Sequence, residues 1–312
     1  MKIVFMGTPG FAVNSLNALV CAGHEIVGVV TQPDKPVGRK RIITKSPVKM
    51  YAETNGIAVY QPRRIRDAEA VAYISEWEPD LIVTAAYGQI LPLELLEMPR
   101  LGAINVHASL LPKYRGAAPI NRAIIDGEKV TGITIMYMTE QMDAGDIILQ
   151  KEVEIGSTIT AGELTDLLSE IGAELLVDAV ALIAGGEVRA VKQDELLVTY
   201  APMIKREDEL IDFARSSEAI ANQIRGLNPT PNAYTYRDDT VFKVISAEAN
   251  NGKVVAEPGT IVEINKDQLV VATGDGSISL FEVQPAGKKA MTIAQFLQGT
   301  RLQKGDKFGE SK

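Results

Sequence analysis

Two polar side chains, Asn105 and His107, follow one another at a spacing of two near the end of a short apolar run. Residues i and i+2 of a strand face the same side, so we expect both side chains to point into one space. An asparagine amide can donate to a carbonyl oxygen, and a histidine can donate to the same developing charge or move a proton near neutral pH. A lone histidine at a strand end more often has a structural role. The pairing with Asn105 instead favours a pocket that handles a carbonyl group.

A second set of candidate groups lies in the polar turn at 140–146, which contains Asp143 and Asp146. Aspartate is common in turns for structural reasons. A carboxylate there could equally orient His107 or relay its proton. The spacing alone leaves both interpretations open.

Other kinds of chemistry have little support in the sequence. Two distant histidines and one cysteine cannot build a zinc site, so we expect no metal. Ser109 lies close to His107 but lacks the sequence of a nucleophile elbow. The single cysteine fits a reducing cytoplasm, and no secretion signal or apolar run of about 18 residues is present, so we expect a cytoplasmic protein without a membrane span.

Strand-like and helix-like segments alternate over roughly the first 185 residues. This alternation predicts an α/β fold with an open, mostly parallel sheet. In such sheets, ligands bind beyond the carboxyl ends of the strands, where the loops after residues 31, 85, 107 and 139 should lie. The first turn, at 7–10, is not G-x-G-x-x-G, so a dinucleotide site is not expected.

Short alternating runs separated by turn residues occupy the last third of the chain and predict a small, OB-like β-barrel. We therefore expect a first domain over 1–188, a linker over 189–207 and a second domain over 208–312.

The segment at 32–49 is rich in basic residues and punctuated by Gly and Pro, whereas the whole chain has a net charge of −8. A generic charge run of this kind is most simply a solvated surface loop. Its length and single sign, in an acidic protein, also suit contact with a phosphate backbone.

The residues at 105–120, Asn-Val-His-Ala-Ser-Leu-Leu-Pro-Lys-Tyr-Arg-Gly-Ala-Ala-Pro-Ile, resemble the signature of the folate-dependent formyltransferases. Further matches occur at 31–34, 131–136, 142–147, 228–231 and 284–291, so the resemblance covers nearly the whole chain. It implies a Rossmann-like catalytic sheet and a catalytic trio of Asn105, His107 and Asp143.

The resemblance also implies a ligand, 10-formyltetrahydrofolate, as formyl donor without a metal. Its pterin would lie against the loops at 86–91 and 138–143, and the segment 109–112 would line the same site. The implied folate-binding residues are Tyr87, Gly88, Ile90, Leu91, Ser109, Leu110, Leu111 and Pro112.

The acceptor that the resemblance implies is initiator methionyl-tRNA. Nothing in the sequence suggests an extended self-association seam, so we expect a monomer. Because acidic residues outnumber basic ones over 207–312, we expect local basic footprints in place of a broadly basic domain. The expected tRNA-binding residues are Lys35, Arg39, Lys40, Arg41, Lys45, Lys288 and Lys289. Two alternatives stay open: a formyltransferase acting on an amino-sugar nucleotide or glycinamide ribonucleotide, and a non-catalytic RNA-binding protein.

Overall fold

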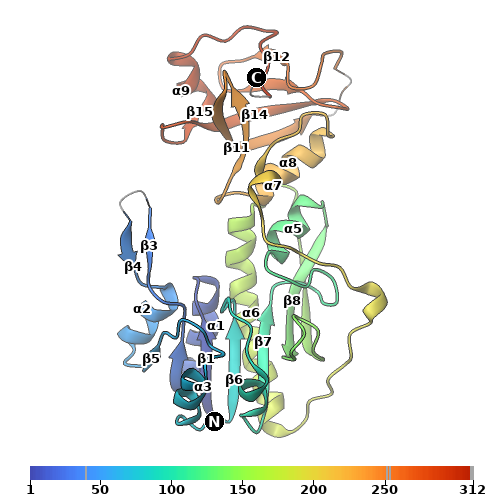
Figure 1. Ribbon diagram of the computed structural model, residues 1–312. Coiled ribbons are helices and arrows are strands. Elements are labelled where there is room, and N and C mark those ends of the chain that lie inside the picture. The colour runs from blue at the N-terminus through green and yellow to red at the C-terminus, as the bar shows by residue number, and fades with distance from the viewer. Residues whose placement is uncertain (39–40, 251, 253, 310–312) are drawn as a thin grey trace. The chain divides into compact units, whose positions relative to one another are not determined.

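The computed structural model describes residues 1–38, 41–250, 252 and 254–309 (Figure 1). The chain forms two compact units. The first unit contains Met1–Pro119, Val130–Glu154 and Thr165–Ala201, and the second contains Ile120–Lys129, Ile155–Leu164 and Pro202–Lys312. Each unit is described by itself below.

A seven-stranded sheet forms the centre of the first unit, in the order β5-β2-β1-β6-β7-β8-β9. The strands from β5 to β7 are parallel, and β8 and β9 continue the sheet antiparallel. β1 and β6 are buried along nearly their whole length, as expected for parallel strands covered on both faces. The predicted open, mostly parallel sheet is thus confirmed. The strands are β1 (Lys2–Gly7), β2 (Glu25–Val30), β5 (Val59–Tyr60), β6 (Leu81–Ala85), β7 (Ala103–His107), β8 (Val130–Tyr137) and β9 (Ile147–Glu154).

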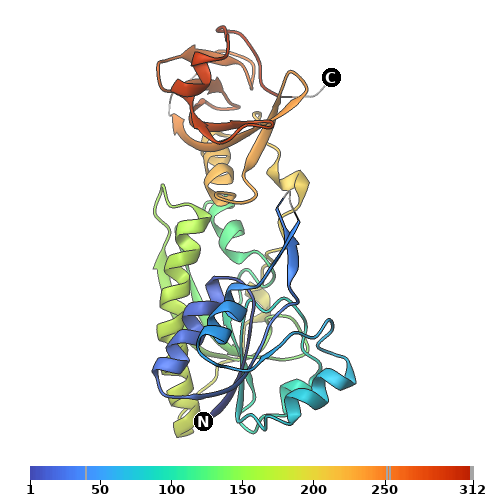
Figure 2. The same cartoon turned by 90° about the vertical axis from the view of Figure 1, so that its left-hand side faces the viewer.

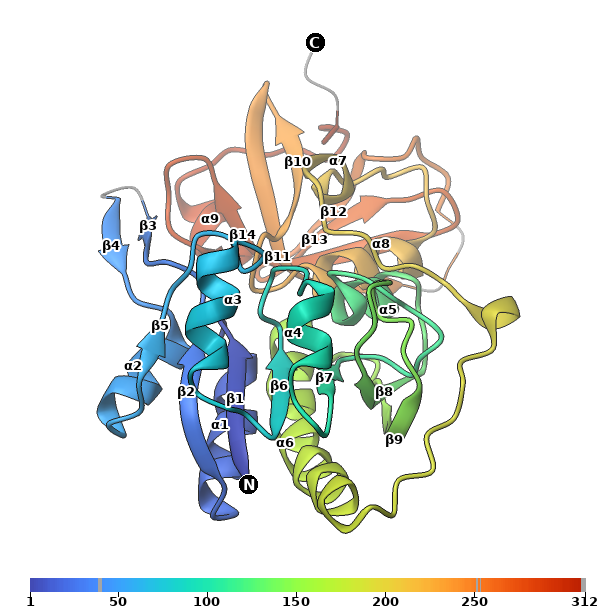
Figure 3. The same ribbon diagram turned by 60° about the horizontal axis from the view of Figure 1, so that its bottom comes forward.

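Helices cover both faces of this sheet. α1 and the long α6 lie side by side on one face (Figure 2), and α3 and α4 lie on the other (Figure 3). Gly172 on α6 lets that helix approach β7 and β8 closely, because a Cβ there would lie 3.1 Å from Val106 and 3.4 Å from Ile133. The helices are α1 (Phe11–Cys21), α2 (Pro47–Thr54), α3 (Ala68–Ser75), α4 (Leu93–Glu97) and α6 (Ala161–Gly185), with a 3₁₀ turn at Glu195–Leu197.

The basic segment that the sequence suggested as a loop contains a short antiparallel hairpin, β3 (Lys35–Val37) and β4 (Ile42–Thr44). A polar cluster fastens its base. Lys49 Nζ donates to Asp34 Oδ2 at 2.8 Å and to Gln61 Oε1 at 2.7 Å, and Gln61 Nε2 donates to Asp34 Oδ1 at 2.8 Å. These bonds from Lys49 and Gln61 lower the pKa of Asp34. Lys49 is therefore already paired within the protein.

The second unit is built on an antiparallel sheet in the order β10-β11-β14-β13-β12, with β15 paired to β14. Phe242, Phe296 and Phe308 lie in its core, and the Phe242 ring centroid is 5.2 Å from each of the other two. The predicted small β domain is confirmed. Its elements are α7 (Arg206–Glu209), α8 (Ser217–Gly226), β10 (Ala233–Arg237), β11 (Thr240–Asn250), β12 (Ile261–Ile264), β13 (Leu269–Ala272), β14 (Ser277–Pro285), β15 (Met291–Thr292) and α9 (Ile293–Gln298).

Polar contacts attach residues 120–129 to the rest of the second unit. These residues include most of helix α5 (Pro119–Ile125). Asn121 Nδ2 donates to Gly226 O at 2.7 Å, and Arg122 Nη2 donates to Asp208 Oδ2 at 2.7 Å. The Arg122 guanidinium lowers the pKa of Asp208 chiefly through its hydrogen bonds to that carboxylate. The pair therefore stabilises the unit whenever Asp208 is ionised.

We predict that Asp208→Asn lowers the free energy of unfolding of the second unit by about 1–2 kcal/mol at pH 7, because it removes a charged hydrogen-bond partner. The folded pKa of Asp208 lies below its unfolded value, so the stabilisation is complete above an unfolded pKa of about 3.9. It is lost as the pH falls through the folded pKa. Amide hydrogen exchange in β11 and β14 measures this difference. The exposed Asp267→Asn is the control, and equal effects of the two substitutions would contradict the prediction.

Candidate active site

Asn105 and His107 lie at the carboxyl end of β7, between β6 and β8. Asn105 is paired in register with Thr84 on β6, and His107 with Thr134 on β8. Asn105 is half-buried and His107 is buried. Alternate residues of a strand share a face. The structure thus brings both side chains to one end of the sheet, as the spacing predicts.

The Asn105 amide is oriented by its neighbour on β6. The Thr84 hydroxyl lies 2.7 Å from Asn105 Oδ1 and donates to it. A carbonyl oxygen that accepts this bond leaves the Nδ2 amino group as the free donor of the amide. Within the described part of the chain, Nδ2 makes no hydrogen bond. Thr84, which sequence reasoning missed, therefore holds Asn105 so that a donor remains for a ligand.

The His107 ring is held by the loop that follows it. Its Nε2 lies 3.0 Å from the Tyr114 carbonyl oxygen, which can only accept, so Nε2 carries a proton. Nδ1 lies 3.6 Å from Asp143 Oδ1, longer than a hydrogen bond but within ion-pair distance. Nδ1 is thus the ring atom that can exchange a proton, and an imidazolium formed there lies against a carboxylate.

Of the two aspartates in the 140–146 turn, Asp143 is the one that lies against His107. Its Oδ2 accepts a hydrogen bond from the Gly116 amide at 2.8 Å. Its backbone is left-handed, with φ of 53°. The Asp146 carbonyl instead accepts from the Tyr137 amide at 2.9 Å, as part of the turn itself. The geometry therefore distinguishes the two aspartates, which the spacing alone could not: Asp143 lies against His107, and Asp146 belongs to the turn.

The segment 109–112 is tightly held by hydrogen bonds. The Ser109 hydroxyl donates to Lys113 O at 2.7 Å, and Thr134 Oγ1 donates to Ser109 O at 2.6 Å and accepts from Leu111 N at 3.1 Å. Ser109 and Leu111 are buried, whereas Leu110 and Pro112 are partly exposed. A ligand beside this segment would therefore contact the side chains of Leu110 and Pro112 first.

The other expected folate-binding residues differ widely in exposure. Tyr87 and Leu91 are buried in a core cluster of the first unit. The Tyr87 hydroxyl has no hydrogen-bond partner among the described residues, and burial raises the pKa of this phenol. Gly88 is exposed with a left-handed φ of 86°, and the side chain of Ile90 is 74% exposed. Ile90 is thus the side chain of this loop that is most available to a ligand.

The expected tRNA-binding residues that the structure describes are all exposed. Lys35 begins β3 at the base of the hairpin, Arg41 lies in its turn, and Lys288 and Lys289 follow β14 in the second unit. Lys45 differs, because its Nζ donates to Glu53 Oε2 at 2.6 Å and this bond raises the pKa of Lys45. Arg39 and Lys40 lie outside the described residues.

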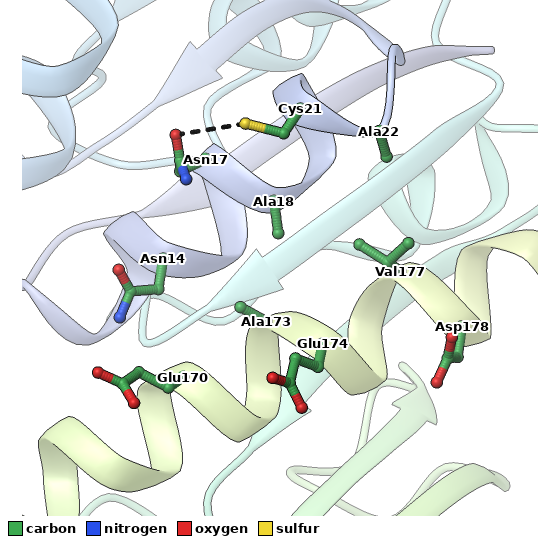
Figure 4. Close-up of a pocket in the computed structure, with 10 residues that line it drawn as sticks. All are labelled: Asn14, Asn17, Ala18, Cys21, Ala22, Glu170, Ala173, Glu174, Val177 and Asp178. Atoms are coloured by element: carbon green, nitrogen blue, oxygen red, sulfur yellow. Dashed lines mark hydrogen bonds between the residues drawn. The ribbon is translucent and has the colours of Figure 1, made fainter.

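An open pocket lies between α1 and α6, with a cavity volume of about 650 Å³ (Figure 4). Glu170, Glu174 and Asp178 line it from α6, and none of the expected site residues does. In the described ranges no group of three His, Cys, Asp or Glu residues could hold a metal ion. No described helix is long and apolar enough to span a membrane.

Comparisons with known proteins agree with the resemblance in the 105–120 segment. A formyl transferase family model matches residues 1–180, and a model of the formyl transferase C-terminal domain matches 203–301. The chain is 53% identical over 312 residues to a methionyl-tRNA formyltransferase of Bacillus mycoides, covering 100% of this chain and 99% of that relative. A methionyl-tRNA formyltransferase of Bacillus cytotoxicus is 53% identical over 99% of both chains.

Solved structures with low sequence identity share the fold. WlaRD, a sugar 3N-formyl transferase, has a TM-score of 0.68 at 22% identity and covers 93% of this chain and 99% of its own. HypX from Aquifex aeolicus, in complex with tetrahydrofolic acid, has a TM-score of 0.65 at 16% identity over 95% of this chain and 47% of its own. With both domain models matched in order and relatives similar along the entire length, this chain belongs to the formyl transferase family.

Proposed function

We propose that this protein transfers the formyl group of 10-formyltetrahydrofolate to the free α-amino group of initiator methionyl-tRNA. The observation that carries the proposal is the 53% identity to methionyl-tRNA formyltransferases over the full length of the chain. The sugar formyltransferase WlaRD, at 22% identity, shares the fold alone. We assign catalysis to residues 1–188, the connection to 189–207 and tRNA contact to 208–312, in a cytoplasmic monomer.

The amide of Asn105 suits the first step of this reaction. The neutral amine of the aminoacyl-tRNA attacks the formyl carbon, a C–N bond forms, and the carbonyl oxygen becomes an oxyanion. Asn105 Nδ2 donates to that oxygen, while Thr84 keeps the amide from rotating. A preorganised donor of this kind contributes about 2.7–4 kcal/mol to the transition state.

His107 and Asp143 handle the proton. The attacking nitrogen becomes positively charged and must lose a proton before the intermediate collapses. Nδ1 of His107 is available for this proton because Nε2 is held by the Tyr114 carbonyl. The Asp143 carboxylate, 3.6 Å away, stabilises the imidazolium. The imidazolium hydrogen-bonds the oxyanion without transferring its proton. The oxyanion then re-forms the carbonyl as the C–N bond to the donor breaks, and the proton passes from the imidazolium to the folate nitrogen.

The folate donor is assigned to the loops beside this trio. The pterin would lie between the loops at 86–91 and 138–143, with 109–112 along the same site. Met138 supports this assignment, because its sulfur lies 3.2 Å from the Thr84 hydroxyl that holds Asn105. Among the eight folate-binding candidates, Ile90, Leu110 and Pro112 have side chains accessible enough for direct contact.

The proposal predicts that purified protein with 10-formyltetrahydrofolate formylates initiator methionyl-tRNA, with kcat/KM at least about 10³-fold above that for any amino-sugar nucleotide. Formyl incorporation from a radiolabelled donor, measured for each acceptor in parallel, gives the ratio. Formylation of the sugar amine alone would overturn the acceptor. RNA binding without any formyl transfer would favour the non-catalytic alternative.

The hairpin supplies a second prediction, about tRNA affinity. Changing Lys35 and Arg41 together to Ala should raise KM for tRNA. The slope of log KM against the logarithm of the salt concentration should fall by about 1.8, because two phosphate contacts are lost. KM for the folate should stay unchanged. Lys45→Ala should have a smaller effect, because Glu53 already pairs with that cation.

Lys151→Ala is the matched control for the hairpin variants, since it removes an exposed lysine on β9 that pairs with Glu174. Initial rates at four or five salt concentrations measure all of these effects. A salt slope equal to that of the unchanged protein would remove the hairpin from the tRNA-binding surface.

A further inference from the structure

The segment at 191–201 runs beside the loops that carry the candidate catalytic residues, all within the first unit. Val191 pairs with Ile147 in an antiparallel bridge, and Tyr200 pairs with Arg115 in a parallel bridge. The Arg115 amide donates to Thr199 O at 2.9 Å, and the Ala201 amide donates to Arg115 O at 2.7 Å. A stretch that the sequence suggested as linker is thus hydrogen-bonded to the Arg115 loop and to the start of β9, which directly follows the Asp143 turn.

Gln193, in the middle of this segment, is buried and uses its whole hydrogen-bonding capacity. Its Nε2 donates to the backbone carbonyls of Asp143 and Gly145, each at 2.8 Å. Its Oε1 accepts from Arg115 Nε at 3.0 Å and Nη2 at 2.8 Å. A glutamine amide has two N–H donors and two acceptor lone pairs, and here all four are in use. The side chain therefore joins the Asp143 turn directly to the Arg115 loop.

The two neighbours of Arg115 in sequence contact the two members of the His107–Asp143 pair. The Tyr114 carbonyl accepts from His107 Nε2, and the Gly116 amide donates to Asp143 Oδ2. The Arg115 guanidinium, on a residue only 4% exposed, lies between Gln193 and the exposed Glu195. A shift of this loop relative to the Asp143 turn would change the distance between the imidazole and the carboxylate.

The turn itself needs such an anchor. Asp143 adopts a left-handed backbone, which is unfavourable for a residue other than glycine by about 1 kcal/mol or more. Gly145 is packed so closely that a Cβ there would overlap the Tyr137 carbonyl. The two carbonyls that Gln193 holds belong to these two residues. Its hydrogen bonds therefore favour the one backbone conformation that directs the Asp143 carboxylate at His107.

We propose that Gln193 is a positioning residue for formyl transfer, which fixes the Asp143 turn on the Arg115 loop and so keeps the carboxylate against His107 Nδ1. This inference rests on the proposed function for its kinetic consequence. Its structural consequence, the position of the Asp143 carboxylate, is independent of the reaction.

Exchanging the amide of Gln193 and the carboxylate of Glu195 distinguishes the loss of hydrogen-bond donors from a change of charge beside Arg115. Gln193→Glu keeps the size of the side chain and an acceptor for Arg115, but removes both N–H donors. Glu195→Gln is the matched control. It removes a negative charge beside the same guanidinium, and the Glu195 side chain is 69% exposed. The double variant, Gln193→Glu with Glu195→Gln, keeps the total charge around Arg115 and still lacks the donors.

We expect kcat to fall about 10-fold or more in both variants that contain Gln193→Glu, with KM for folate and for tRNA within about twofold of the unchanged protein. Glu195→Gln should retain kcat within about twofold. Full recovery of kcat in the double variant would show that charge, not donation, caused the loss, and would overturn the proposal.

Hydrogen exchange of the Gly116 amide tests the same inference without any enzymatic assay. That amide donates to Asp143 Oδ2, so release of the turn should raise its exchange rate about 10-fold in both Gln193→Glu variants and leave it unchanged in Glu195→Gln. Unchanged Gly116 exchange would overturn the positioning role. If the unchanged protein transfers no formyl group, the proposed function fails, while the exchange rates still decide whether Gln193 positions Asp143.

Discussion

The hydrogen bond from the Gly116 amide to the Asp143 carboxylate joins two loops on which the rest of the candidate site depends. One loop continues from β7 and carries Tyr114, whose carbonyl orients His107. The other links β8 to β9 and places Asp143 in a left-handed conformation. Because β7 and β8 are antiparallel, His107 at the end of β7 lies beside Thr134 within β8, whereas Tyr137 and Met138 pair with Ile104 and Ala103 at the start of β7. The β8–β9 turn that follows Met138 must therefore fold back to bring Asp143 to Gly116 and His107. Neither loop alone would set the 3.6 Å distance between His107 Nδ1 and Asp143 Oδ1.

The same arrangement explains how a largely apolar sheet can support polar chemistry. Asn105, His107 and Asp143 each have one side of the functional group occupied by a protein partner, namely Thr84, Tyr114 and Gly116. Groups held in this way need little reorganisation when charge develops on a substrate, which is the basis of electrostatic stabilisation in acyl transfer. The polar atoms left available to a substrate are Nδ2 of Asn105 and Nδ1 of His107, which lies beside the Asp143 carboxylate. An amide N–H can stabilise an oxyanion, and an imidazole beside a carboxylate can move a proton.

Local patterns in the sequence predicted the part of this account that depends on one strand or one turn. The spacing of Asn105 and His107 predicted their shared face, and the alternation of apolar segments predicted the parallel sheet and the following β domain. Sequence alone could not choose between Asp143 and Asp146, because the choice depends on the backbone of a turn packed against a distant loop. Gln193 and Thr84 were missed for a related reason: each acts through hydrogen bonds to residues at least 20 positions away. The hairpin in the basic segment was also missed, since its base is fastened by Gln61 from outside that segment.

The most direct test of the central claim, that Asn105 and His107 act on one reacting centre, is the kcat/KM of Asn105→Ala, His107→Ala and the double variant. His24→Ala, a change in the other histidine of the chain, is the control. We predict losses of about 10²–10³-fold for each single variant, and a double variant much less impaired than the product of the two, because groups that act as a unit are not additive. His107→Ala with the activity of the unchanged protein, or losses that simply multiply, would contradict the account.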